Sequence, residues 1–380
     1  MALMVYLNRV QFGFGALAET AEELRLAGIR RPLVVTDAGV RAAGLLDRLL
    51  GELPADTAAA VFDATPPNPD EAAVHAAVAL YLSSGADGVL ALGGGSPLDL
   101  AKAVALAATH DAPRLAPYAV VEGGLARITA AAAPIVAVPT TAGTGSEVSR
   151  GALIILDDGR KVSIGSPHLI PRAAICAPEL TLGLPAGLTA ATGMDAMAHC
   201  IETLCSAREN PIADAIALDG LGRAWRALPR AVENGADRDA RKEMMLASMQ
   251  GALAFQKGLG AVHALSHALG ALPVRPHHGT LNALLLPPVL RFNAPEIGGV
   301  VPRLAQAVGV APTADALADA IAALNRRIGL PGSLAAMGVP NESLPAVAAA
   351  AMRDHHHQTN PRRAEEGDYL RLLRAAHAGG

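Results

Sequence analysis

The chain has 380 residues, with 31 basic and 35 acidic side chains and a formal net charge of −4, so it lacks the basic excess of a nucleic-acid binder. Apolar residues make up 51% and charged residues 17%, which excludes a disordered chain, and aromatic residues at 3% are too few for a stacking platform on single-stranded nucleic acid. The length predicts two or three domains of roughly 150 residues each.

The first half of the sequence alternates short β-type runs with helical segments. A helix is expected from Val40 to about Leu53, and two more are expected to start at Asn68 and Ser96, each a capping residue followed directly by proline. Buried-strand patterns occupy residues 31–37, 61–63, 88–92 and 134–138. This alternation predicts a parallel sheet between two layers of helices.

Two further patterns follow along the chain. Residues 151–164, with Asp-Asp-Gly at their centre, predict a β-hairpin. After Leu184-Pro185 the strand-like runs disappear and helical periodicity dominates. We therefore expect an α/β domain at residues 1–184 and an all-α domain at residues 185–380. The run His355-His356-His357 is expected to form a solvated helix end.

The chain carries neither a membrane-spanning pattern nor a disulfide framework. Its cysteines, Cys176, Cys200 and Cys205, form no CxxC pair, which favours a reduced, cytoplasmic setting. The N-terminal residues place an apolar run before the first positive charge, the reverse of a secretory signal. The longest uncharged stretch, residues 128–146, contains two prolines and two glycines and is too interrupted to cross a bilayer.

Two polar loops follow predicted strands of the same sheet. Gly93-Gly94-Gly95-Ser96 opens a helix, where free backbone amides attract a phosphate. Residues 139–147, Pro-Thr-Thr-Ala-Gly-Thr-Gly-Ser-Glu, bring hydroxyls and glycines to another strand's carboxyl end. Either loop alone could be a tight connection, and Asp99 with Lys102 could be only a surface pair. Together the loops favour a phosphate or ribose ligand.

A cluster of histidines marks the second half. Asp195 and His199 are spaced i, i+4 on a predicted helix, which places them on one face about 6 Å apart at Cβ. His263 and His267 have the same spacing, and His277-His278 follows closely. A single histidine on an apolar helix is usually a core residue, but several with a carboxylate are costly to bury without a shared partner. A divalent metal such as Fe²⁺ or Zn²⁺ is the simplest partner.

These motifs, in this order and spacing from about residue 31 to about residue 362, resemble those of the iron-containing (group III) alcohol dehydrogenases. The resemblance rests on Gly93–Ser96, Pro139–Glu147, Gly193-Met-Asp195-Ala-Met-Ala-His199, and His263-xxx-His267-xx-Gly270 with His278-Gly279. It implies a Rossmann-like dinucleotide-binding domain followed by an all-α domain, as in the dehydroquinate synthase-like fold, and a homodimer. It also implies NAD and Fe²⁺, with Zn²⁺ as the alternative ion.

The resemblance also implies roles for particular residues. The metal ligands would be Asp195, His199, His263 and His278, with His277 as the alternative fourth ligand because this chain has two histidines where the family commonly has one. His267 would be a proton relay near the reacting carbon. The residues implied for the cofactor are Asp37, Asn68, Gly94, Gly95, Ser96, Asp99, Thr140, Thr141, Thr144, Ser146, Lys161 and Leu180.

The function implied is the interconversion of an alcohol, or a hydroxy acid, with its aldehyde or ketone through hydride transfer to NAD. A maleylacetate reductase-like oxo-acid reductase, a dehydroquinate synthase-like lyase and a non-catalytic metal-binding protein are the alternatives. Asp37 would favour NAD over NADP by repelling the extra phosphate, and it could equally be a helix N-cap. Lys257 could pair with a substrate carboxylate, although a solvated lysine at a helix end is the commoner arrangement.

Overall fold

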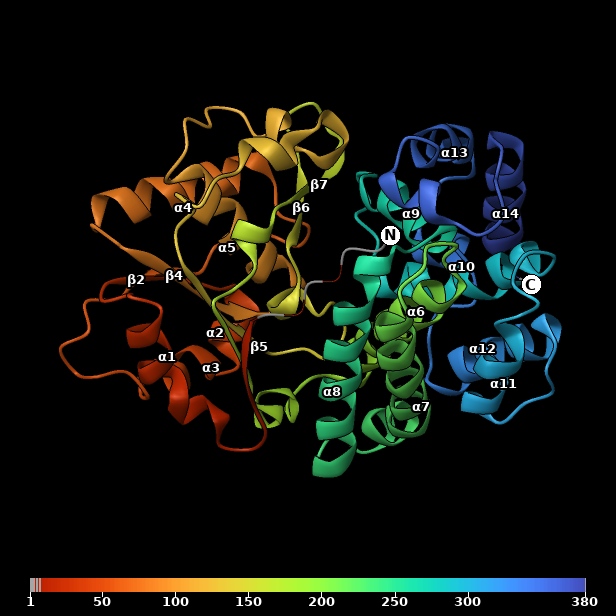
Figure 1. Ribbon diagram of the computed structural model, residues 1–380, viewed down its shortest axis with the longest axis horizontal. Helices are drawn as coiled ribbons and strands as arrows, with labels where there is room; N and C mark the ends of the chain where they lie inside the picture. Colours follow the sequence, from red (N-terminus) through yellow and green to blue (C-terminus); the bar gives the residue numbers. More distant parts are fainter. Residues whose placement is uncertain (1–3, 5, 7, 380) are drawn as a thin grey trace. The chain divides into compact units, whose positions relative to one another are not determined.

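The computed structural model describes Met4, Tyr6 and residues 8–379, and the chain divides into two compact units (Figure 1). The sheet unit comprises the described residues of 6–141 and 145–183. The helical unit comprises the described residues from Leu184 onward, residues 142–144 and Met4.

Six parallel strands form the main sheet of the sheet unit, in the order β1-β8-β5-β4-β2-β3. They are β1 (Arg9–Phe12), β2 (Pro32–Val35), β3 (Ala60–Phe62), β4 (Gly88–Gly93), β5 (Ile135–Pro139) and β8 (Ala173–Cys176). The four expected strands are β2 to β5, and the predicted parallel sheet is confirmed. Sequence reasoning missed β1 and β8, because both are short and the β8 segment Ala-Ala-Ile-Cys begins with two residues of low β propensity.

Both faces of this sheet are buried, as the strand sequences require. Successive residues of a strand point to opposite faces, and Leu33 and Val35 of β2 enter one hydrophobic cluster while Val34 enters the other. The same alternation runs along β4 and β5. Helices α4 (Glu71–Ser83) and α5 (Gly95–Ala107) supply the first cluster, and α1 (Thr20–Leu26) and α3 (Leu45–Leu50) supply the second. This double coverage explains the near-continuous apolar strands.

The single helix expected from Val40 to Leu53 is wrong, because the segment forms two helices. α2 (Ala38–Ala42) and α3 are separated by Gly44, whose φ of 73° lies in the left-handed region. A residue with that dihedral cannot continue a right-handed helix, and glycine adopts it without steric cost.

Both expected helix starts are also displaced. α4 is capped by Asp70, whose side chain accepts a hydrogen bond from the Ala73 amide, while Asn68 itself is left-handed with φ of 52°. α5 begins at Gly95 with Gly94 as its N-cap, so Ser96 lies inside the first turn. Asn68 and Ser96 are therefore not N-caps, and the backbone amide of Asn68 donates a hydrogen bond to Ser96 Oγ.

The predicted hairpin is present as a separate two-stranded antiparallel sheet. β6 (Gly151–Ile155) pairs with β7 (Lys161–Gly165), and Gly159 of the connecting turn has φ of 82°.

Every regular element that the structure describes from Leu184 onward is helical. The helices are α6 (Ala186–Cys205), α7 (Pro211–Glu233), α8 (Arg238–Ala254), α9 (Ala261–Gly270), α10 (His278–Asn293), α11 (Val301–Val308), α12 (Ala314–Arg327), α13 (Leu344–Ala351) and α14 (Glu366–Ala378). The long helices α6, α7 and α8 pack against one another (Figure 1), and α6 also packs against α10. No helix in the described part of the chain is long and apolar enough to cross a membrane.

Candidate metal centre and nucleotide-binding edge

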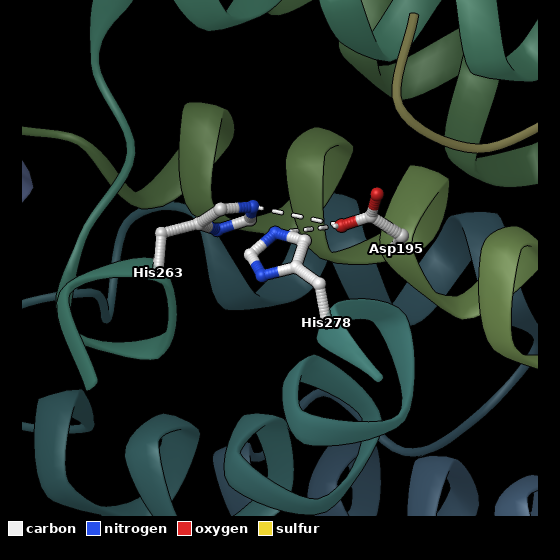
Figure 2. A group of neighbouring side chains, drawn as sticks. All are labelled: Asp195, His263 and His278. Atoms are coloured by element: carbon white, nitrogen blue, oxygen red, sulfur yellow. Dashed lines mark ion pairs between the residues drawn. The ribbon is translucent and has the colours of Figure 1, made fainter. Parts of the chain in front are cut away.

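Three imidazoles of the helical unit converge on one carboxylate oxygen, Oδ1 of Asp195. Asp195 and His199 lie on α6, His263 lies on α9, and His278 is the first residue of α10. The Nε2 atoms of His199 and His263 are each 3.7 Å from this oxygen, and that of His278 is 3.6 Å from it. Figure 2 shows the imidazoles of His263 and His278 directed at the Asp195 carboxylate, and one potential metal-ligand atom of each of these three residues lies within 4.8 Å of the others. One metal ion can therefore be reached by ligand atoms of Asp195, His263 and His278.

The cluster is buried, which makes its charges energetically important. Asp195 and His263 are each 2% exposed, and His199 is 4% exposed. Burial alone would raise the pKa of Asp195, but the three surrounding imidazoles lower it below its usual range and keep the carboxylate ionised. Burial lowers the pKa of His199 to about 4, so its imidazole is neutral. An ionised carboxylate beside a neutral imidazole is a donor set for a divalent cation.

Glu202 orients His263 by bonding to the ring nitrogen that does not face Asp195. Its Oε2 accepts a hydrogen bond from Nδ1 of His263, and its Oε1 accepts one from the Val262 amide at 2.8 Å. The bond from Nδ1 to Glu202 orients the ring so that Nε2 of His263 faces Asp195. Burial lowers the pKa of His263, but its bonds with Asp195 and Glu202 raise it to about 9. The same two carboxylates would attract a metal cation.

Asn282, one turn after His278 on α10, marks the point on which the ligand atoms converge. Its Nδ2 donates to Asp195 Oδ1 at 2.7 Å and lies 3.2 Å from Nε2 of both His263 and His278. The carboxylate oxygen and the two imidazole nitrogens thus all lie around the side-chain NH₂ group of Asn282. This convergence is the structural observation that the residues fit a metal ion.

A glycine brings α10 close enough to α6 for His278 to reach the cluster. A Cβ on Gly279 would lie 2.1 Å from the carbonyl oxygen of Ala191, a distance that no side chain permits. His278, directly before this contact, faces Asp195, whereas His277 is the N-cap of α10 and is exposed. The structure therefore brings His278, and not His277, to the cluster.

His267 lies beside the metal cluster and is held by a carboxylate. Its Nδ1 is 2.9 Å from Oδ2 of Asp354, and its ring stacks on His278 with centroids 5.4 Å apart. Asp354 precedes the 3₁₀ helix η11 (His355–Thr359) and caps it. The carboxylate places the His267 proton on Nδ1 and leaves Nε2 as an acceptor.

The expectation that His355–His357 form a solvated helix end is wrong. All three are half-buried, and the His356 ring lies 5.4 Å from that of His267 and 5.8 Å from that of His263, centroid to centroid. Burial and the neighbouring imidazoles lower the pKa of His356 well below its usual range. Proximity to His267 depends on tertiary packing across 87 positions from His267 to Asp354, which local periodicity cannot reveal.

Asp37, Gly94 and Thr140 follow the carboxyl ends of β2, β4 and β5, respectively. β2 and β4 are neighbours, but the chain continues from β2 toward β3 and from β4 toward β5, so the strand order reverses between them. Such a switch point is where open α/β sheets bind nucleotides. The Gly93 carbonyl accepts from the Thr140 amide at 2.9 Å, and a Cβ on Gly94 would lie 3.2 Å from Thr141, which joins the β4 and β5 loops.

Three candidates from distant segments meet at this edge. The Lys161 ammonium donates to Asn68 Oδ1 at 2.6 Å, and the Asn68 amide donates to Ser96 Oγ at 3.2 Å. Gly95 begins α5, so the first turn of that helix is presented beside them.

Asp99, Lys102 and Ser146 form a buried network, and the reading of Asp99 with Lys102 as a surface pair is wrong. Lys102 is 1% exposed and donates to Ser146 Oγ at 2.7 Å, while that hydroxyl donates to Asp99 at 2.8 Å. Burial lowers the pKa of Lys102 to about 8 and raises that of Asp99. Asp99 and Ser146 are thus engaged in fixing the loop after β5.

The remaining candidates have different surroundings. Asp37 follows β2, is half-buried, and caps α2 by accepting from the Val40 amide at 2.8 Å. Leu180 is buried in the 3₁₀ helix η7 (Pro178–Thr181). Thr144 belongs to the helical unit.

Lys257 is neither solvated nor free to pair with a substrate carboxylate. It is 5% exposed, and its ammonium donates to Asp214 Oδ1 on α7 at 2.6 Å. Asp214 already neutralises the charge of Lys257, which argues against a substrate carboxylate there.

Comparison with known proteins places both units in one family. The model of the iron-containing alcohol dehydrogenases matches residues 8–178, and that of the family's C-terminal domain matches residues 189–377. The chain belongs to the iron-containing alcohol dehydrogenase family. It is therefore an NAD-dependent, iron-containing alcohol oxidoreductase with a Rossmann-like unit and an all-α unit, and the lyase alternative is not supported.

Three relatives illustrate the likeness. A 4-hydroxybutyrate dehydrogenase of Cupriavidus necator is 54% identical over 98% of this chain and 99% of its own. A crystal structure of 1,3-propanediol oxidoreductase has a TM-score of 0.92 at 36% identity, covering 99% of this chain and 100% of that one. Sulfoacetaldehyde reductase from Bifidobacterium kashiwanohense, in complex with NAD⁺, has a TM-score of 0.87 at 30% identity and covers 99% of each chain.

The two adjacent histidines give a matched pair for testing the metal centre. His278→Ala removes an imidazole that faces Asp195, so we expect iron content to fall at least tenfold after dialysis against a weak chelator. His277→Ala removes an exposed imidazole from the same turn and should retain iron near the wild-type content. Iron per chain is measured by mass spectrometry of the purified proteins. The opposite ranking would assign the fourth ligand to His277.

Asp37 gives a test of cofactor choice. A carboxylate at the end of β2 would repel the 2′-phosphate of NADP, so Asp37→Gly should lower the ratio of kcat/KM for NAD over NADP by about tenfold. Glycine is chosen because it costs an N-cap only a few tenths of a kcal/mol. Asp237→Gly, which removes the aspartate N-cap of α8, is the control and should leave the ratio unchanged. A wild type that prefers NADP would refute the role of Asp37.

Proposed function

We propose that the alcohol oxidised by this enzyme is a short ω-hydroxy acid, with 4-hydroxybutyrate as the first substrate to test. The observation that carries the proposal is the 54% identity, over nearly the whole of both chains, to a protein named 4-hydroxybutyrate dehydrogenase. A 38% identical relative from Klebsiella pneumoniae is named 1,3-propanediol dehydrogenase, which makes a diol the natural comparison substrate.

The metal would be held by Asp195, His199, His263 and His278. A divalent ion there supplies Lewis-acid chemistry at the alcohol oxygen, which lowers the cost of forming the alkoxide. Glu202 keeps the Nδ1 proton on His263 so that Nε2 faces the site. The three cysteines are free and buried, and the donor set is oxygen and nitrogen, which suits Fe²⁺ and also Zn²⁺.

His267 would accept the proton of the alcohol. Asp354 fixes the proton of His267 on Nδ1, and Nε2 is then the basic atom that can receive the hydroxyl proton, directly or through water. Asp354 stabilises the imidazolium that results. NAD, when bound, would supply the hydride acceptor for the carbon-bound hydrogen.

NAD would be bound at the β2, β4 and β5 edge of the sheet unit. Gly94, Gly95 and Ser96 would receive the pyrophosphate on the N-terminal amides of α5. The rest of the nucleotide would be contacted by Asp37, Asn68, Thr140, Thr141, Thr144, Lys161 and Leu180, over a loop fixed by Asp99 and Ser146. The functional boundary between nucleotide-binding and metal-binding domains would lie at residues 184–185.

The assembly would be a homodimer in the cytoplasm. β1 is an edge strand of the sheet, and an open edge is suited to pairing with a second copy. Three unpaired, buried cysteines agree with a reducing compartment. A sedimentation mass of one chain, 38.6 kDa, would contradict the dimer.

Substrate choice is tested by initial rates with NAD and a panel of alcohols of equal length. We expect kcat/KM for 4-hydroxybutyrate to exceed that for 1,4-butanediol and 1-butanol by at least about tenfold, since a charged hydrogen bond to the carboxylate contributes that much discrimination. Reduced nicotinamide is followed by its absorbance. A preference for the diol or the simple alcohol would reject the hydroxy acid while leaving the family activity intact.

A further inference from the structure

A second group of polar side chains lies next to the metal cluster in the helical unit. It consists of His267 on α9 with Asp354, His355 and His356 at the start of η11. The rings of His355 and His356 are 3.9 Å apart, and His356 is 5.4 Å from His267, centroid to centroid. The side chain of His355 is 28% exposed, so this second group is partly accessible to solvent.

Most polar atoms of this group have partners, but the His356 imidazole does not. Asp354 is engaged through both oxygens, because Oδ2 bonds to His267 and Oδ1 accepts from the His356 backbone amide at 2.8 Å. The His356 ring has only ring contacts among the residues that the structure describes. Its nitrogen atoms have no hydrogen-bond partner there and are not among the fully buried polar atoms, so they are open to a ligand.

The distance from the metal cluster suits a short ligand. The His356 ring lies 5.8 Å from His263, one of the residues facing Asp195. A four-carbon hydroxy acid spans about 5 Å from its hydroxyl oxygen to its carboxyl carbon when extended, given single bonds near 1.5 Å. A carboxylate beside His356 is therefore compatible with a hydroxyl at the metal cluster.

We propose that His356, with His355 beside it, binds the carboxylate of the hydroxy acid and so determines the preference for an acid over a plain alcohol. The proposal rests on the proposed function and names the residues that give it specificity. An imidazole has at least one N–H donor whether neutral or protonated, so recognition does not depend on its titration. The charge of Asp354 is already engaged by His267 and the η11 backbone, which reduces repulsion of the incoming carboxylate.

The same side chains could instead hold a second metal ion. Ligand atoms of His267, Asp354 and His356 lie within 4.8 Å of one another. The hydrogen bond between His267 Nδ1 and Asp354 argues against this occupant, because a protonated Nδ1 has no lone pair for a metal. A metal content of two ions per chain, with one lost in a His356 variant, would overturn the carboxylate proposal.

The test compares 4-hydroxybutyrate with 1,4-butanediol, which replaces the carboxylate by a hydroxymethyl group. His356→Leu should lower the ratio of kcat/KM for the acid over the diol by at least about tenfold, mainly through KM for the acid. His356→Asn, which keeps an N–H donor, should recover part of the ratio. Iron per chain is measured for every variant, and one ion per chain is expected.

His357→Gln is the matched control from the same run of histidines. The His357 imidazole bonds to the Tyr369 hydroxyl at 2.9 Å and belongs to neither polar group, so its replacement should leave the ratio unchanged. Equal losses on both substrates in His356→Leu, or no loss on either, would reject the carboxylate subsite while a wild-type preference for the acid would still support the proposed function. A wild type that prefers the diol would reject both.

Discussion

The helical unit is organised around one buried negative charge, the carboxylate of Asp195. Isolated in an apolar interior such a charge would cost several kcal/mol, and it persists here because three imidazoles and the Asn282 amide surround it. This arrangement requires α6, α9 and α10 to meet at one point. Gly279 permits that meeting because any side chain at its position would collide with α6. The packing of these three helices and the convergence of side chains on Asp195 are therefore one structural requirement.

The cluster around Asp195 could be predicted in part from the sequence, because some of its residues follow local rules. Asp195 with His199 occupies an i, i+4 pair on a single helix, and a polar pair on an apolar helix face is visible in the sequence itself. Glu202 carries part of the same signal, since it lies three residues after His199 on the same buried helix. Glu202 was not predicted as part of the site, because a further carboxylate on a helix is usually solvated. Its position beside His263 becomes visible only in the three-dimensional structure.

The other side of the site depends on contacts that no local pattern encodes. Asp354 and His356 meet His267 only when η11 packs against α9, so a run of three histidines resembled a solvated helix end. Lys257 shows the converse error, because its burial against Asp214 comes from α7. In the sheet unit, alternation predicted the parallel strands, whereas Gly44 divided a helix through a backbone dihedral that composition alone does not specify. Residue type and period predicted most of the sheet and the helical second half, whereas backbone dihedrals set helix boundaries and tertiary packing decided the side-chain partners.

X-ray absorption at the iron edge of the purified, iron-loaded enzyme tests directly whether iron binds at the Asp195 cluster. We expect an iron coordinated by three imidazole nitrogens and a carboxylate oxygen, with no sulfur, and a loss of one imidazole from the spectrum of any iron retained by His278→Ala. A spectrum with sulfur ligation, or one unchanged by that substitution, would show that the iron lies elsewhere and that the Asp195 cluster is not the metal centre.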